Sequence, residues 1–73
     1  MIPLSYARNG KYRVVSIMGG RNLRKRLADM GISEGTLLKV SNSMNGPVLI
    51  EVNGSRYVIG TGMAMRILVR QEG

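Results

Sequence analysis

Short apolar runs, each closed by glycine or another turn residue, recur along the chain and predict strands. The clearest signal is Asn53-Gly54, which separates two runs of alternating apolar and polar residues and is typical of a hairpin. Another run is rich in β-branched residues and lies between the turn signals Asn9-Gly10 and Gly19-Gly20. The predicted strands are residues 12–18, 37–41, 48–52, 55–59 and 67–69.

One segment, residues 21–30, has the period of a helix instead. Leu23 and Leu27 lie one turn apart on one face, and charged residues occupy the other face. Gly31 stands where a left-handed residue ends a helix, and Ile32 follows as the apolar residue that contacts Leu27. We therefore predict a short helix that is held by packing rather than by propensity.

The predicted order is strand, helix, three strands, one helical turn over residues 63–66, and a last strand. Five short strands in so short a chain are not stable as a flat sheet, whereas a closed barrel buries the aliphatic faces. We predict a mainly β fold, a small SH3-like barrel of about five strands, with the helix over an open end. Residues 70–73 are expected to fray.

The composition bounds the size and the chemistry of the protein. With 73 residues the chain is expected to be a single domain, residues 1–73. It has no Phe or Trp, so its core must be aliphatic, and it has no Cys or His. Disulfides, thiol catalysis, imidazole metal ligands and histidine bases are therefore excluded. We expect no enzyme activity and no cofactor.

The net charge of the chain indicates the sign of the charge on its partner. Eleven Lys and Arg against four Asp and Glu give a net charge of +7, which favours an anionic partner. No apolar run approaches the length of a membrane span, and the first residues do not resemble a secretion signal. These features predict a cytoplasmic protein.

The basic cluster Arg21, Arg24, Lys25 and Arg26 is the first candidate binding site. It is either a docking face for an acidic surface or an ordinary solvated helix face. Only Asp29 is placed to offset Lys25, and it lies in the weaker order for a helical ion pair. This excess of positive charge favours the docking face.

The methionines are the second candidate. Met18 and Met30 are expected to fill the core, whereas Met44, Met63 and Met65 are expected to form an adaptable binding surface. Thioethers prefer softer ions than Fe(II), and the four carboxylates are scattered, so no metal site is predicted.

Several short motifs, in a fixed order over nearly the whole chain, resemble one family. They are Pro3-Leu4-Ser5, Gly10, Tyr12-Arg13-Val14-Val15-Ser16-Ile17, Leu23-Arg24-Lys25-Arg26-Leu27, Met30-Gly31-Ile32, Gly35-Thr36, Val40, Gly54, Ala64 and Ile67-Leu68-Val69. Together they resemble the FeoA family, the small cytoplasmic component of bacterial ferrous iron transport systems.

The resemblance implies an SH3-like barrel and a non-enzymatic accessory or regulatory protein. It implies a partner, the ferrous iron permease with its cytosolic GTP-binding domain, and contact with the membrane only through that permease. It also implies similarity to the SH3-like domain of metal-dependent iron repressors. Many members carry charged residues where this chain has Gly60-Thr61-Gly62-Met63. The predicted partner-binding residues are Arg21, Arg24, Lys25, Met63 and Met65.

Two alternatives stay open at this point. A small basic nucleic-acid-binding barrel fits the charge, but three tyrosines are few for stacking bases and no recognition helix stands out. Nucleic acid is therefore the less favoured partner. A homo-oligomer formed through an exposed edge strand is also compatible with the sequence.

Overall fold

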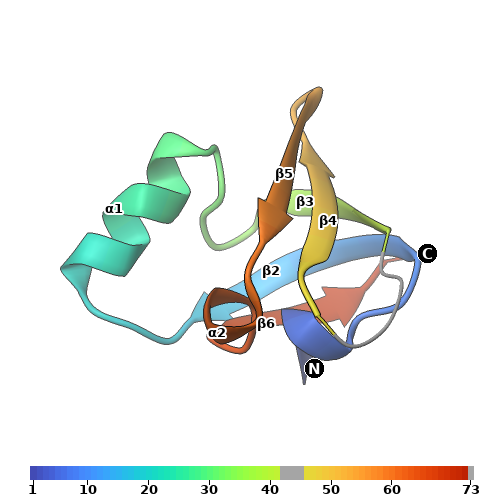
Figure 1. Cartoon of the computed structure of the whole chain (residues 1–73), viewed down its shortest axis with the longest axis horizontal. Coiled ribbons are helices and arrows are strands. Elements are labelled where there is room, and N and C mark those ends of the chain that lie inside the picture. Colours follow the sequence, from blue (N-terminus) through green and yellow to red (C-terminus); the bar gives the residue numbers. More distant parts are fainter. Residues whose placement is uncertain (42–45, 73) are drawn as a thin grey trace.

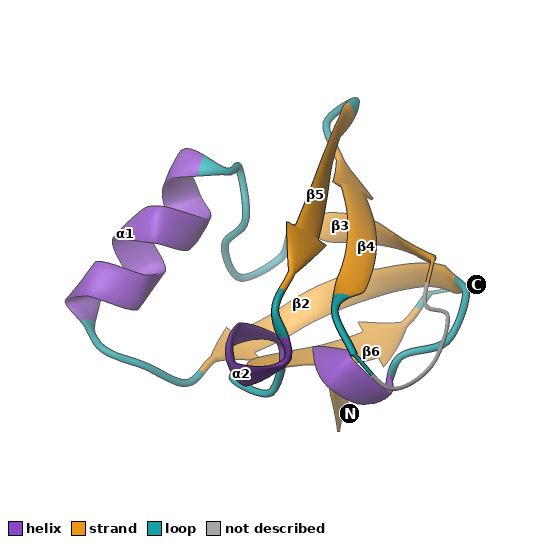
Figure 2. Cartoon of the chain, viewed as in Figure 1, coloured by secondary structure: helices purple, strands orange, loops and turns teal. Residues whose placement is uncertain are grey.

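Strands dominate the computed structural model, which describes residues 1–41 and 46–72 (Figures 1 and 2). In chain order the elements are β1 (Ile2–Pro3), the 3-10 turn η1 (Leu4–Tyr6), β2 (Gly10–Ile17), α1 (Arg21–Asp29), β3 (Leu37–Ser41), β4 (Val48–Val52), β5 (Ser55–Ile59), α2 (Thr61–Ala64) and β6 (Ile67–Gln71). The predicted mainly β fold is confirmed. The predicted loop at residues 42–47 lies mostly outside the described residues, and Met44 with it.

All six strands belong to one antiparallel sheet with the order β1-β6-β2-β3-β4-β5. The sheet bends strongly, so that β4 and β5 rise across β2 and β6 (Figure 2). The register of β2 against β6 shifts between Val14 and Ser16, and such a bulge increases the local bend. The sheet does not close, so β1 and β5 are its two edges.

The core is aliphatic, as predicted, apart from the ring of Tyr12. Every strand from β2 to β6 contributes buried side chains, and β2 and β4 contribute three each. The 3-10 turn and α2 add Leu4 and Ala64, whereas α1 adds Leu27 and its C-terminal loop adds Ile32. Leu23 and Met30 pack against this core while remaining partly exposed.

The C-terminus of α1 confirms the predicted glycine stop. Gly31 has a φ of 84°, its N–H donates to the carbonyl of Ala28 at 2.9 Å, and the N–H of Ile32 donates to the carbonyl of Leu27 at 2.8 Å. This pair of bonds is the Schellman motif, and the fully buried side chains of Leu27 and Ile32 supply its apolar contact.

The Asn53-Gly54 hairpin is also confirmed. Asn53 and Gly54 have φ values of 52° and 81°, which is the type I′ turn that suits the twist of a two-residue hairpin. Val52 pairs with Ser55 across this turn, and the turn therefore sets the register of β4 and β5.

Two expectations about the C-terminal part were wrong. Residues 70–72 do not fray: Arg70 and Gln71 pair with β2, and the N–H of Glu72 donates to the carbonyl of Lys11 at 2.8 Å. The helical turn begins at Thr61 rather than at residue 63, because the chain already turns after Gly60, whose carbonyl accepts from the N–H of Ala64.

The short strand β1 and the turn η1 were not predicted from the sequence. A two-residue strand that includes Pro3 has too few residues to show an alternating pattern. It forms because Ile2 and Pro3 pair with Val69 and Leu68 of β6.

Candidate functional site

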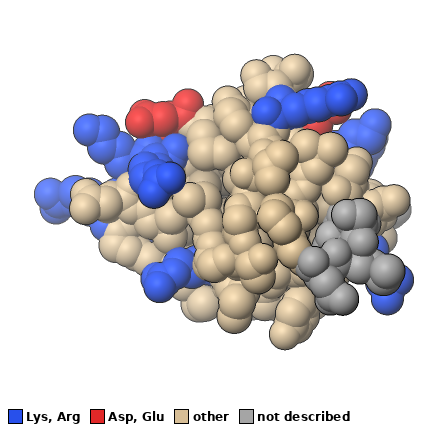
Figure 3. All heavy atoms as spheres, viewed as in Figure 1, with Lys and Arg blue, Asp and Glu red and all other residues tan. Residues whose placement is uncertain are grey.

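The outer surface of α1 carries exposed cations at one end of the molecule. Arg21, Lys25 and Arg26 are exposed, and none forms an ion pair within residues 1–41 and 46–72. Lys25 and Asp29 do not come within ion-pair distance of each other in this part of the chain. Figure 3 shows Lys and Arg side chains gathered at the end where α1 lies. This surface has a net positive charge that nearby carboxylates do not cancel.

Arg24 differs from its neighbours on α1 because it is held by the rest of the fold. Its Nη2 donates to the carbonyl oxygen of Ile17 at 2.7 Å, and its Nη1 lies 3.6 Å from Oε2 of Glu34. The guanidinium therefore joins α1 to the end of β2 and to the loop that follows the helix. Arg24 is about half exposed, so it positions the helix and still contributes charge to the surface.

A shallow hollow lies where β2 ends and α2 passes into β6. It is lined by Met18, Gly62, Met65 and Arg66. The N–H of Met18 donates to the carbonyl of Arg66 at 2.7 Å, which holds the two sides of the hollow together. Met18 and Met65 are 51% and 53% exposed, so two flexible apolar side chains face solvent here.

The predicted positions of the methionines are only partly correct. Met65 is exposed and Met30 packs against the core, as expected. Met18 was expected in the core but is exposed, because it follows the buried Ile17 and neighbouring residues of an extended chain point to opposite sides. Met63 was expected on the binding surface but is half-buried, because its side chain packs against the core.

The basic helix and the hollow are connected through the end of β2. Arg24 binds the carbonyl of Ile17, and the next residue, Met18, lines the hollow. The structure thus brings Arg24 close to the chain segment that carries Met18, while Arg21 and Lys25 lie on the exposed face of α1. We call Arg21, Arg24, Lys25, Met18, Met65 and Arg66 the helix–methionine surface. The sequence did not predict that Met18 and Arg66 belong to this surface. The hydrogen bond between their main chains joins residues 48 positions apart.

Two glutamates outside this surface lie within ion-pair distance of arginines. Glu72 accepts from Nη2 of Arg13 at 3.2 Å, and Arg70 lies 3.5 Å away. The Arg13 hydrogen bond, with the charges of Arg13 and Arg70, holds the pKa of Glu72 below its ordinary value despite partial desolvation. Glu51 pairs with Arg56.

The described residues offer no obvious metal centre. Within residues 1–41 and 46–72, no three His, Cys, Asp or Glu side chains are grouped so that they could hold an ion. None of the helices in these residues is long and apolar enough to cross a membrane. The geometry instead presents exposed cations on α1 and exposed methionines at the end of β2.

Comparisons with known proteins identify the class. The family model of the FeoA domain matches residues 2–71. A protein of Methanocaldococcus jannaschii named "Putative Fe(2+) transport protein A" is 44% identical over 70 residues, which cover 94% of this chain and 85% of the relative. The chain belongs to the FeoA family, a family of small proteins accessory to Fe(2+) transport.

Solved structures agree with this family. The crystal structure of an iron uptake regulatory protein, FeoA, is 44% identical, with a TM-score of 0.86 over 97% of this chain and 96% of that one. The FeoA protein of Chlorobium tepidum is 25% identical, with a TM-score of 0.85 over 99% of this chain and 71% of the other. ScaR with bound Zn2+ is 19% identical with a TM-score of 0.87, and this chain covers 37% of it, so that likeness shows the fold alone.

Proposed function

We propose that this FeoA protein docks on the cytosolic part of a ferrous iron permease, at or beside its GTP-binding domain, through the helix–methionine surface. Family membership supports a role in Fe(2+) transport. The observation that carries the proposed surface has two parts. Exposed Met18 and Met65 line one hollow at the end of β2, where Arg24 of α1 binds the carbonyl of Ile17. The cations Arg21 and Lys25 on the same helix have no ion pair within residues 1–41 and 46–72.

The two parts of the surface have different roles in docking. Cations on α1 speed and orient the approach of an acidic surface, because their field reaches beyond contact distance. The methionines then bury apolar area, and their flexible side chains adapt to the groups they meet. Arg24 positions α1 against β2 and so keeps the two parts together.

The experiment is a binding titration against the cytosolic GTP-binding domain of the permease at low and physiological salt. The test variant is Arg21→Glu with Lys25→Glu, because these two side chains make no ion pair with the residues that the structure describes. Its matched control is Arg8→Glu with Lys11→Glu, which makes the same change of charge on exposed residues outside α1. We expect the test variant to weaken binding about tenfold or more and the control to weaken it much less.

A second variant tests the apolar part. Met65→Ser removes an exposed thioether and should shorten the lifetime of the complex while leaving the association rate nearly unchanged. Equal losses in test and control variants would mean that only overall charge matters. Oligonucleotide binding that survives physiological salt, without binding to the domain, would overturn the proposal in favour of a nucleic-acid-binding barrel.

A further inference from the structure

The edge strand β5 is a second surface, separate from the helix–methionine surface. The other edge of the sheet is β1, which has only two residues, one of them Pro3. β5 has five residues, and its sequence Ser-Arg-Tyr-Val-Ile contains neither proline nor lysine. Proteins commonly protect edges with short strands, proline, charged side chains or bulges. β1 uses two of these devices, whereas the one charged side chain of β5 is Arg56.

We propose that the free edge of β5 binds an extended, acidic segment of a partner protein, which adds to the sheet as a seventh, antiparallel strand. Peptides are recognised in this way when main-chain hydrogen bonds give affinity and alternate side chains give specificity. The proposal concerns a surface other than α1 and holds whether or not α1 docks on a permease.

The backbone of β5 is arranged for this pairing. The type I′ turn at Asn53-Gly54 makes Val52 and Ser55 a hydrogen-bonded pair, and hydrogen-bonded pairs alternate with open pairs along an antiparallel ladder. Arg56 and Val58 therefore belong to the open pairs, and their N–H and C=O groups point away from β4. In the described residues these groups make no hydrogen bond outside the ladder.

The side chains beside this edge are also exposed. Val58 is 68% exposed and lies opposite Leu49, which is 36% exposed, on the outer face of the sheet. Two apolar side chains facing water next to an open edge would be covered by an apolar side chain of an added strand. Burial of such a cluster favours association, because apolar area is removed from water.

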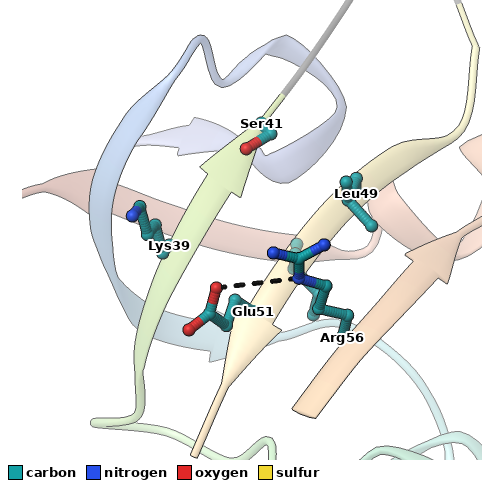
Figure 4. A pocket seen from close by; sticks show the side chains of 6 residues that line it. Lys39, Ser41, Leu49, Glu51 and Arg56 are labelled. Carbon is teal, nitrogen blue, oxygen red and sulfur yellow. Dashed lines mark ion pairs between the residues drawn. The ribbon is translucent and has the colours of Figure 1, made fainter. Parts of the chain in front are cut away.

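Charge selects the occupant. Arg56 lies opposite Glu51 on the same outer face, but its Nε is 4.0 Å from Oε1 of Glu51 and it forms no hydrogen bond with the described residues (Figure 4). Lys39 lies opposite Glu51 from the other side. The guanidinium of Arg56 thus keeps its donors for a carboxylate, which it can bind in bidentate geometry.

The register predicts the sequence of the added strand. In an antiparallel pair, the residue opposite Val58 comes first and the residue opposite Arg56 comes two positions later. The favoured segment is therefore an apolar residue, any residue, and then Asp or Glu. A second copy of this chain fits less well, since a two-fold pairing about Tyr57 sets Arg56 against Val58 and joins two molecules of charge +7.

The test is an NMR titration of the full chain, observed through backbone amides, with three synthetic peptides at millimolar concentration. The first is acetyl-Thr-Ile-Thr-Glu-Thr-amide. The second has the same sequence with N-methyl groups on Ile and Glu, whose N–H groups would pair with β5. The third has Lys in place of Glu. We expect saturable shifts at Arg56 and Val58 with the first peptide, no binding of the second, and about tenfold weaker binding of the third.

Two variants complete the test. Val58→Lys places a charge on an exposed position of the edge and should abolish binding without unfolding the protein. Ile2→Lys makes the matched change on β1 and should leave binding intact. Absence of shifts at β5, equal binding of the N-methylated peptide, or β5 shifts that depend on protein concentration without peptide would each overturn the proposal. The last result would assign the edge to a second copy.

Discussion

The helix α1 and the six-stranded sheet are held in different ways, although both belong to one small chain. Each strand from β2 to β6 is paired with its neighbours and buries side chains in a common core. Within α1 itself, Leu27 is the one fully buried residue, and Arg24 adds a polar tie to β2. A nine-residue helix is not stable alone, so these few contacts hold it in place.

This difference separates stability from binding. The buried side chains of the sheet are constrained by packing, and changing them destabilises the fold. The exposed side of α1 is free of packing, and its charges can change with little effect on stability. A surface that must meet a partner is best built on such a face, because its chemistry can vary while the scaffold stays the same.

The largest expected effect comes from removing one buried side chain in each region. Ile50→Ala in β4 and Leu27→Ala in α1 both create a cavity, and each should cost about 2–5 kcal/mol. Denaturant unfolding measures the loss of stability, and amide hydrogen exchange shows which elements of the structure lose protection. We expect Leu27→Ala to speed exchange in α1 before the sheet, and Ile50→Ala to speed it throughout.

Equal acceleration of exchange in α1 and the sheet of the Leu27→Ala variant would contradict the comparison. It would mean that α1 unfolds together with the sheet as one cooperative unit.

The two glycines at the ends of α1 should respond in opposite ways. Gly31→Ala places a side chain at a φ of 84° and within 3.1 Å of Nδ2 of Asn53, so it should destabilise by about 1–2 kcal/mol. Gly20→Ser lies at the helix start, where φ is −80° and no side chain of the described residues caps the helix. It should stabilise by about a few tenths of a kcal/mol, and thermal unfolding measures both. Changes of the same sign in the stability of the two variants would contradict this prediction.

A smaller effect is expected for the polar tie of α1. Arg24→Gln keeps much of the stem but loses the hydrogen bond to Ile17 and the pair with Glu34, and should cost about 1 kcal/mol. The matched control is Arg26→Gln, because the Arg26 side chain has no hydrogen bond or ion pair within residues 1–41 and 46–72, and this variant should cost almost nothing. An equal cost for both variants, measured by urea unfolding, would refute the role of Arg24 as a tie.

The smallest effect is a pH dependence of the sheet. The pKa of Glu72 is lowered in the folded protein, so its ion pair with Arg13 contributes stability above the ordinary pKa of 4.5, and this contribution is lost as the pH falls through the lowered value. Comparing the acid unfolding of the wild type with that of Glu72→Gln isolates the contribution of this ion pair. The variant should be less stable than the wild type at neutral pH, and the difference should shrink below pH 4.5. A constant difference would show that the charge of Glu72 is not responsible.

Local signals predicted most of the fold. The type I′ hairpin and the glycine stop of α1 each depend on a few neighbouring residues, so both can be recognised in the sequence. The pairing of Arg70 and Gln71 with β2 could not be predicted, because the partner strand lies more than 50 residues earlier. A bulge in β2 likewise shifts the register within one strand.

The candidate site was predicted less completely. Composition and period placed cations on one helix, but they could not show that Arg24 is tied to Ile17 while Arg21 and Lys25 stay without a partner in the described residues. Exposure of Met18 depends on where β2 stops, and its contact with Arg66 depends on how the chain returns through α2. These features depend on the tertiary structure, and the spacing of residues in the sequence does not predict them.

The most direct test of the central claim is to map which amides of this chain are shielded when the cytosolic GTP-binding domain of the permease is bound, using NMR cross-saturation. We predict a footprint that covers α1, Met18 and residues 62–66 and leaves β1 untouched. A footprint confined to β5, or one spread evenly over the basic residues of the whole surface, would contradict the assignment of docking to the helix–methionine surface.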